Sequence, residues 1–274
     1  TALAMLVEEG KISWDDRVIT HLPDFQMFDP YVTREMRIRD LVTHRSGLGL
    51  GAGDLLIWPE TTYTRDEIVK RIRHLKPVSS FRTKYDYDNL LYMVAGQIVP
   101  AVTGRSWDDF VRERIFAPLG MSDSSTTIES LRDGGNDAVP HSVVDGTVRA
   151  IRAQSIDNAG PAASINSNVA DLAKWMIVQL DRGSLTSLRP DTDARLFSEA
   201  SSREMWSPQT ILPNADPPSG FEALRSNFAA YGLGWFLAEY QCRKVVSHTG
   251  GLAGYVSKTT LVPDERLGVV VLTN

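Results

Sequence analysis

The segment Tyr85-Asp-Tyr87-Asp88-Asn89 carries side chains that could take part in acid–base chemistry. Tyr87 and Asn89 are two residues apart in a loop that leads into a predicted helix, so both side chains should point to one side. A phenol held near cations can lose its proton below its usual pKa of about 10 and act as a general base. The amide of Asn89 can donate to and accept from a substrate amide. The same residues also fit a structural role, in which Asp88 or Asn89 caps the helix and the tyrosines pack.

A second segment, Val246-Ser-His248-Thr249-Gly250-Gly251-Leu-Ala-Gly254, places a predicted strand end, polar side chains and glycines in a row. Glycines let the backbone approach a ligand closely, and free backbone N–H groups can bind the negative charge that develops on a reacting carbonyl oxygen. The pattern also fits a tight turn in a hairpin. Neither segment alone decides between chemistry and structure.

Other common catalytic and binding motifs are absent from the 274 residues. The sequence has no G-x-S-x-G nucleophile elbow and no Walker A motif. The five histidines lack the spacing of a zinc site, and the single cysteine, Cys242, rules out an internal disulfide. The glycines from Gly47 to Gly53 match a dinucleotide-binding pattern only loosely and are expected to form a loop. We therefore expect no metal and no cofactor.

The composition is ordinary for a soluble globular protein, and a small molecule or a peptide is the kind of substrate that the resemblance described below implies. No run approaches the roughly 20 apolar residues of a membrane helix. The net charge of −5 and the lack of a basic stripe argue against a nucleic-acid partner. The densest basic run, Lys70 to Lys76, ends a predicted helix and is expected to be solvated surface. The sequence leaves the oligomeric state open.

Helical patterns fill the middle of the chain, and strand patterns fill its end. The predicted helices cover residues 1–9, 36–43, 65–75, 88–103, 106–117, 169–181 and, less regularly, 199–206. Thr64, Ser106 and Ser167 are the predicted caps of three of them. Strand-like runs follow at 231–239, 244–248, 254–262 and 267–273, with short connections typical of an antiparallel meander. This order predicts an α/β (α+β) fold, with an antiparallel sheet flanked by helices and a mainly helical lobe across a cleft.

The motifs, taken in order, resemble the serine β-lactamase and penicillin-binding-protein superfamily, especially class C β-lactamases, D-stereospecific peptidases and family VIII esterases. Six segments carry the resemblance across nearly the whole chain. They are Thr1 to Asp16, similar to the segment after the family's Ser-x-x-Lys, then Ile38 to Leu48, Phe81 to Leu90 with its Tyr-x-Asn, Ala159 to Ser164, Tyr231 to Trp235 and His248 to Gly251. Six landmarks in one order are far more specific than any single one.

The resemblance implies a serine hydrolase that works through an acyl-enzyme. It implies six site residues: Tyr87, His248 and Gly251 for catalysis, and Asn89, Thr249 and Gly250 for substrate binding. Tyr87 would assist proton transfer, and the backbone N–H of Gly251 would be one oxyanion donor. His248 stands where many relatives have the lysine of Lys-Thr-Gly. Because histidine there is commoner among the esterases and peptidases, the resemblance points away from a dedicated β-lactamase.

The sequence departs from the family pattern at the nucleophile. None of the seven lysines has a serine three residues before it, so we expect the family's Ser-x-x-Lys just upstream of Thr1, together with the first strands of the sheet. The chain as given is then expected to be inactive. The resemblance implies one catalytic domain over 1–274, incomplete at both ends, with a sheet lobe of 1–30 and 165–274 and a helical lobe of 31–164. It also implies a periplasmic or extracellular location.

Several interpretations stay open on the sequence alone. The substrate could be an ester, an amide or peptide of a D-amino acid, or a β-lactam-like ring. A rival hypothesis is a non-catalytic binding or sensor relative of penicillin-binding proteins, which has lost the serine or the lysine. A third hypothesis, a helical scaffold without a pocket, predicts that Tyr87 and His248 lie far apart.

Overall fold

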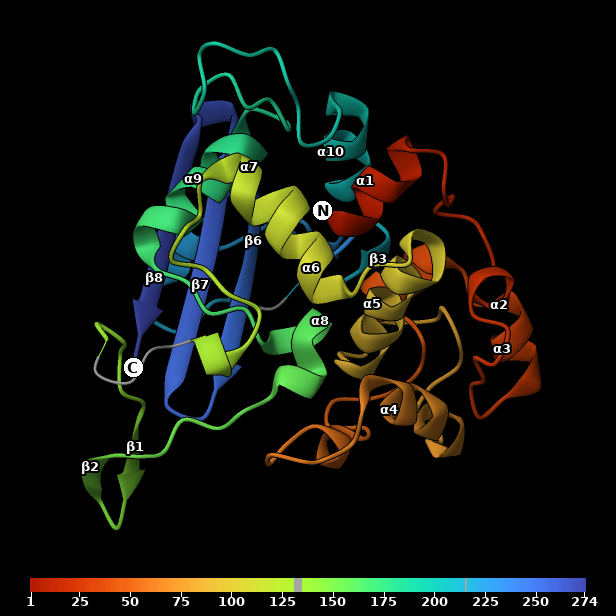
Figure 1. The fold of residues 1–274 in the computed structure, drawn as a ribbon. Helices are drawn as coiled ribbons and strands as arrows, with labels where there is room; N and C mark the ends of the chain where they lie inside the picture. The colour runs from red at the N-terminus through yellow and green to blue at the C-terminus, as the bar shows by residue number, and fades with distance from the viewer. Residues whose placement is uncertain (131–134, 215) are drawn as a thin grey trace.

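A six-stranded sheet and a group of helices stand side by side in the computed structural model, which describes residues 1–130, 135–214 and 216–274 (Figure 1). The strands follow one another in chain order across the sheet, and every neighbouring pair is antiparallel. The strands are β3 (Thr210–Ile211), β4 (Ala229–Tyr231), β5 (Phe236–Tyr240), β6 (Arg243–Leu252), β7 (Tyr255–Val262) and β8 (Leu267–Thr273). The predicted α/β fold with an antiparallel sheet is therefore confirmed.

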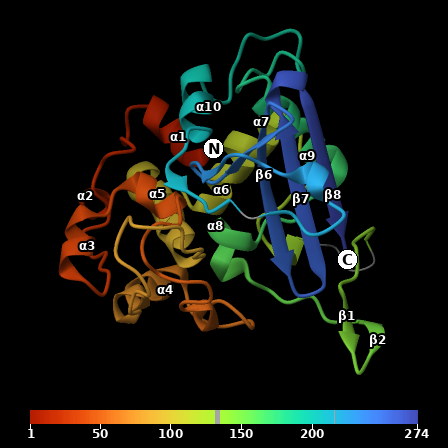
Figure 2. The same ribbon diagram turned by 180° about the vertical axis from the view of Figure 1, so that it is seen from behind.

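The helices lie on one face of the sheet and beside it, as the two opposite views show (Figures 1 and 2). Helix α9 packs on β8, α5 contacts α4 and α8, and α1 contacts α5 and α10. The helices are α1 (Ala2–Glu8), α2 (Val18–His21), α3 (Pro30–Glu35), α4 (Arg65–Arg71), α5 (Leu90–Thr103), α6 (Trp107–Val111), α7 (Ala117–Leu119), α8 (Gly160–Ala163), α9 (Val169–Leu180) and α10 (Glu199–Met205). The division of the chain into two lobes stays a prediction.

A row of buried residues crosses the sheet and explains how it packs against α9. The register pairs Ala230 with Leu237, Leu237 with Val246, Val246 with Leu261, and Leu261 with Gly268. The first four of these residues are at most 2% exposed. At the end of the row, a Cβ on Gly268 would lie 3.4 Å from Met176 Sδ on α9. Because side chains of a strand alternate between faces, this row identifies the face that the helices cover.

Side-chain caps fix the first turn of several helices. Thr64 and Glu67 form the predicted capping box of α4, which continues into the 3₁₀ turn η3 (Ile72–His74), and Ser106 caps α6 as predicted. The predicted cap of α9 was wrong by one residue, because Asn168 rather than Ser167 accepts the N–H of Asp171.

The helix that begins at α6 also runs further than predicted. A π-helical turn (Arg112–Phe116) and α7 carry it through Pro118 to Leu119. Pro118 lies just after the π-helical turn, and α7 ends at Leu119, so the proline interrupts the backbone hydrogen bonds only in the last turn of the helix.

A small hairpin of β1 (His141–Val144) and β2 (Thr147–Ala150) lies inside the stretch predicted to be mainly helical. It projects from the body of the molecule in Figure 1. Its base meets the tight turn between β6 and β7, where Gly254 has φ +79° and a Cβ would lie 2.5 Å from Pro140 Cβ. No strand is predicted for these residues from the sequence. In the described part of the chain, no helix has the length and apolarity needed to cross a membrane.

A buried carboxylate ties the loop before α5 to the 3₁₀ helix η1 (Ile38–Val42). Asp40 is 0% exposed and accepts hydrogen bonds from Arg45 Nε at 2.7 Å and from Arg82 Nη2 at 2.6 Å. Arg82 begins the turn that leads to Tyr87, and its φ of +64° is a conformation that a non-glycine residue rarely adopts. These ion pairs therefore help to place the loop that carries the Tyr-x-Asn motif.

Candidate active site

The loop that carries Tyr87 and Asn89 is aligned by two hydrogen bonds to one residue, His44. The N–H of Asp86 donates to the His44 carbonyl oxygen at 2.7 Å, and the N–H of Asp88 donates to His44 Nδ1 at 3.1 Å. The Asp88 carboxylate accepts the N–H groups of Leu90 and Leu91, so it caps α5, which explains why the helix begins two residues later than predicted. Asp88 thus has the capping role considered from the sequence, and Tyr87 is left half-buried beside it.

His44 is the centre of an aromatic cluster. It is 3% exposed, and its ring centroid lies 4.4 Å from that of Tyr87 and 4.8 Å from that of Tyr231. Tyr85 and Tyr92 pack on it at 5.5 and 5.3 Å. Burial lowers the pKa of His44 to about 3, so its imidazole is neutral at pH 7.

Two further features of His44 are costly for a purely structural residue. Its Nδ1 accepts a hydrogen bond, so Nε2 carries the ring hydrogen, and this buried Nε2 has no hydrogen-bond partner among the described residues. Its φ is +51°, in the left-handed region that costs energy for a side chain with a Cβ. Such strain gathers at functional sites, because the surrounding structure must hold it in place.

His248 lies on β6 and is held at both ring nitrogens. Its Nδ1 lies 2.6 Å from the carbonyl oxygen of Thr249, and its Nε2 lies 2.8 Å from the hydroxyl of Tyr231. The ring of Phe236 packs against it at 5.3 Å. Burial lowers the pKa of His248, which favours the neutral imidazole.

The strand that carries His248 continues through both glycines. The register pairs His248 with Thr259, Gly250 with Ser257 and Gly251 with Val256. The predicted strand end at residue 248 was therefore wrong, and the turn of this hairpin lies at Ala253 and Gly254 instead. Pairing needs only the backbone, so the glycines do not interrupt it.

One edge of β6 is free where the candidate residues lie. Strand β7 pairs with β6 from Val246 to Leu252, whereas β5 pairs only with residues 243–247. Among the described residues, no strand covers the β5-side edge of 248–252. Thr249, Gly250 and Gly251 are exposed, and a Cβ on Gly251 would meet no atom within 4 Å. The backbone here is open to a ligand, as an oxyanion donor requires.

The two candidate segments meet through shared neighbours. Tyr87 packs on His44, His44 packs on Tyr231, and Tyr231 hydrogen-bonds to His248. One cluster therefore joins a loop before α5 with a strand more than 150 residues later in the chain. A scaffold that keeps Tyr87 and His248 far apart does not fit this arrangement.

The charges around Tyr87 differ from those expected from the sequence. Burial raises the pKa of Tyr87, and the carboxylates of Asp54 and Asp88 raise it further. Asp54 belongs to the 3₁₀ turn η2 (Asp54–Leu56) in the glycine-rich loop, its side chain hydrogen-bonds to Asn89, and burial raises its own pKa. The described residues around Tyr87 therefore keep the phenol protonated, and a cation that lowers its pKa has to come from elsewhere.

Sequence reasoning gave no role to four residues of this cluster. His44 and Tyr231 both lie inside segments that resemble family landmarks, so the sequence singled out these segments but predicted no role for either residue. Tyr92 and Asp54 carry no local signal. Tyr92 follows the helix start as one of several apolar residues, and Asp54 follows glycines that only predict a loop.

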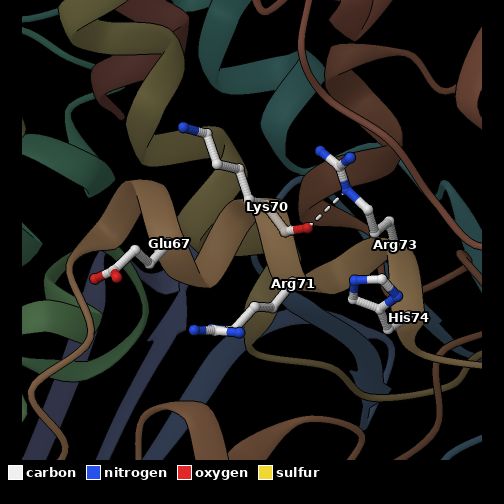
Figure 3. A pocket seen from close by; sticks show the side chains of 5 residues that line it. All are labelled: Glu67, Lys70, Arg71, Arg73 and His74. Carbon is white, nitrogen blue, oxygen red and sulfur yellow. Dashed lines mark hydrogen bonds between the residues drawn. The ribbon is translucent and has the colours of Figure 1, made fainter.

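Two surface cavities contain none of the six predicted site residues. Glu67, Lys70, Arg71, Arg73 and His74 line a hollow of about 380 Å³ at the end of α4, where Arg73 Nε donates to the Lys70 carbonyl oxygen (Figure 3). Lys70, Arg71 and His74 are exposed, as expected for solvated surface. The other cavity, of about 290 Å³, lies between Trp206 and β5. Within residues 1–130, 135–214 and 216–274, no group of three or more His, Cys, Asp or Glu side chains could hold a metal ion.

Comparison with known sequences agrees with the resemblance. A family model described as Beta-lactamase matches residues 1–274. Penicillin-binding protein 4 of Amycolatopsis lactamdurans is 30% identical over 287 residues, which cover 100% of this chain and 68% of the relative. A protein of Aspergillus campestris named Unguisins hydrolase ungD' is 29% identical over 288 residues, which cover 99% of this chain and 49% of the relative. The chain thus spans about half the length of that hydrolase.

Comparison with solved structures finds the same fold. D-amino acid amidase from Ochrobactrum anthropi SV3, in complex with L-phenylalanine amide, superposes with a TM-score of 0.74 at 26% identity and covers 99% of this chain and 71% of the amidase. A mutant class C beta-lactamase superposes with a TM-score of 0.75 at 16% identity, over 100% of this chain and 74% of that enzyme. At that low identity the second match bears on the fold alone.

Proposed function

This chain belongs to the Beta-lactamase family, and from this premise we propose that the complete protein is a serine hydrolase that cleaves esters or D-amino-acid amides through an acyl-enzyme. The observation that carries the proposal is the single cluster that joins the Tyr87–Asn89 loop to the His248–Gly251 strand through His44 and Tyr231. The hydrolase relatives and the matched amidase support the reaction class.

The nucleophile in this proposal is a serine in a Ser-x-x-Lys motif upstream of Thr1, since no lysine of this chain has a serine three residues before it. The serine oxygen attacks the substrate carbonyl carbon, its proton passes to the basic group beside it, and the leaving alcohol or amine departs with a proton. Water then adds to the acyl-enzyme, releases the carboxylic acid and returns the proton to the serine.

The lysine of that motif would also supply the cation that Tyr87 lacks. Burial and two carboxylates raise the pKa of Tyr87, so the described residues alone do not make it a base. An ammonium group beside the phenol would oppose those carboxylates and stabilise the phenolate. In this proposal Tyr87 carries protons between the nucleophile and the leaving group, and Asn89 binds the acyl-side amide of the substrate.

The glycine strand provides the anion site of the proposal. The N–H of Gly251 and the serine's own N–H would donate to the carbonyl oxygen as it becomes negative. Thr249 and Gly250 would line the substrate beside it, on the edge of β6 that has no strand partner among the described residues. His248 would face the substrate as a neutral imidazole at pH 7, because burial lowers its pKa.

The test is to express the complete gene product and to challenge it with p-nitrophenyl esters, D-amino-acid amides, D-alanyl peptides and a chromogenic cephalosporin. We expect turnover of the esters or D-amides, little turnover of the cephalosporin, and mass-spectrometric labelling of one serine by an acylating probe. Tyr87→Phe should lower kcat/KM by roughly 10²-fold or more, whereas Tyr255→Phe, which removes a hydroxyl on β7, should not.

Two results would decide against the proposal. An upstream sequence without Ser-x-x-Lys, or a complete protein in which no serine is labelled, favours the binding or sensor relative considered from the sequence. The same resemblance leads us to propose export to the periplasm or the cell exterior, which fractionation of the native cells would test.

A further inference from the structure

Three side chains form a row of hydrogen-bonding groups behind the candidate site. His248 Nε2 lies 2.8 Å from the hydroxyl of Tyr231, and that hydroxyl lies 3.1 Å from the hydroxyl of Tyr92. The Tyr92 hydroxyl lies 3.1 Å from the carbonyl oxygen of Val42. At the other end, His248 Nδ1 lies 2.6 Å from the carbonyl oxygen of Thr249. The row therefore begins and ends at backbone carbonyl oxygens.

The two ends decide where hydrogens must be. A carbonyl oxygen can only accept, so Tyr92 donates to Val42, and the hydrogen of a neutral His248 is on Nδ1, where it donates to Thr249. His248 Nε2 is then an acceptor, and Tyr231 must donate to it. No hydrogen is left for the contact between Tyr231 and Tyr92. With a neutral His248, one of the four contacts is therefore not a hydrogen bond.

A proton on His248 Nε2 supplies the hydrogen that the fourth contact lacks. The imidazolium donates from Nε2 to the Tyr231 oxygen, the Tyr231 hydroxyl turns to donate to Tyr92, and Tyr92 still donates to Val42. All four contacts are then hydrogen bonds, and in each of them the donor is the group nearer to His248 along the row. The only movement needed is the rotation of one phenolic hydrogen about its C–O bond.

We propose that Tyr231 is a positioning residue for His248, whose hydroxyl points to His248 Nε2 when the imidazole is neutral and to Tyr92 when it is charged. This inference follows from the number of hydrogens available to the four contacts. The effect of Tyr231 on turnover rests on the proposed function, in which His248 faces the substrate. Tyr231 is 0% exposed, so its hydroxyl must form its hydrogen bonds with buried groups, and His248 and Tyr92 are the two that contact it.

Among the described residues, the other groups that face His248 provide no charge that would replace this row. His44 is buried and neutral at pH 7, Phe236 on β5 contributes an apolar ring, and Thr259 is its partner on β7. Burial disfavours the imidazolium, and the row opposes that effect by giving the charged form one more hydrogen bond than the neutral form. Tyr92 is the key residue for this balance, since its hydroxyl accepts a hydrogen bond from Tyr231 only when His248 is charged.

The first experiment measures the histidines of the wild-type protein. Long-range ¹H–¹⁵N spectra of the complete protein with ¹⁵N-labelled histidine report the tautomer and the protonation of each imidazole, and His248→Gln identifies the His248 signals. We expect neutral His248 in the Nδ1–H form, which is the less common tautomer of free histidine. A neutral His248 in the Nε2–H form, or one that stays neutral down to the pH of unfolding, would overturn the proposal.

The second experiment uses Tyr92→Phe. This variant leaves the neutral arrangement of Tyr231 and His248 intact but removes the acceptor that Tyr231 needs when His248 is charged. The pKa of His248 should fall by roughly 0.5 to 1, since the charged form loses one hydrogen bond. Tyr255→Phe is the matched control, because Tyr255 also donates its hydroxyl to a backbone carbonyl, that of Ala138, and has no contact with His248. An unchanged or higher pKa of His248 in Tyr92→Phe contradicts the inference.

The pH profile of ester hydrolysis separates the inference from the proposed function. If both hold, the part of the pH profile of kcat/KM that reflects the titration of His248 shifts in Tyr92→Phe by the same amount as the pKa of His248. If the complete protein turns over no substrate while the NMR pattern is as expected, the function fails and the inference stands. If turnover is found but the pKa of His248 is the same in wild type and Tyr92→Phe, the inference fails and the function stands.

Discussion

The imidazole of His44 lies against the ring of Tyr87, with centroids 4.4 Å apart and planes 31° from parallel. His44 also accepts the N–H of Asp88, the next residue along the loop. One buried side chain thus sets both the ring position of Tyr87 and the backbone that carries it. Tyr231 packs on the same imidazole and links it to His248.

Replacing His44 should therefore damage both stability and activity. His44→Ala leaves a cavity and an unpaired N–H on Asp88, so we expect the free energy of unfolding to drop by about 2–4 kcal/mol. Urea denaturation measures this drop. The exposed His74→Ala should change the free energy by less than about 0.5 kcal/mol. An equal effect of both substitutions would contradict the role given to His44.

The carboxyl of Asp88 should make stability depend on pH. Burial raises its pKa to about 7, whereas an unfolded aspartate titrates near 4. Between these values the folded state holds a proton that the unfolded state has lost, so the contribution of Asp88 to stability is present at low pH and is lost as the pH rises to about 7. The difference in unfolding free energy between wild type and Asp88→Asn should fall by up to about 1.4 kcal/mol per pH unit. A difference that stays constant from pH 4 to pH 7 would show that Asp88 is ionised throughout.

The two adjacent glycines of β6 should respond differently to alanine. A Cβ on Gly251 meets nothing within 4 Å, so Gly251→Ala should keep the unfolding free energy within about 0.5 kcal/mol of wild type. The methyl group would occupy the space of the substrate, and kcat/KM for esters should fall by roughly tenfold or more. A Cβ on Gly250 would lie 2.5 Å from Ser257 Oγ, so Gly250→Ala should also lower the melting temperature. Full activity in Gly251→Ala would argue against a substrate at this edge.

The buried Asp40 should contribute more to the free energy of unfolding than the ion pair of Arg17 and Glu35 does. Asp40→Asn leaves Arg45, whose side chain is 16% exposed, without its anionic partner, so we expect a loss of about 3 kcal/mol in unfolding free energy. The pair of Arg17 and Glu35 is the control, because its side chains are 57% and 29% exposed and Glu35→Gln should cost less than about 1 kcal/mol. Since Arg82 also binds Asp40, the loop of Tyr87 should loosen as well, and kcat/KM should fall with stability.

Local sequence signals predicted several helix starts and the C-terminal meander, but not α3, α8 or the hairpin of β1 and β2. The capping box at Thr64 and the serine cap at Ser106 are short-range interactions, and the structure confirms them. The strand-like runs after residue 229 and their short connections predicted the meander, because antiparallel strands can be joined by tight turns. The errors are also local in origin: neighbouring Ser167 and Asn168 are both good caps, and a glycine pair does not show whether a strand ends or continues.

The sequence by itself therefore determined the longer helices, the antiparallel meander, the family resemblance and the two candidate segments, since each follows from short stretches of the chain and the order in which they occur. The tertiary structure decided what surrounds those segments. His44 and Asp88 are 44 residues apart, and Tyr92 and Tyr231 are 139 apart. Burial raises the pKa of Tyr87 and lowers that of His248, and burial exists only once distant segments have packed. The orientation and the charge of the candidate residues are consequences of that packing, and no local pattern contains them.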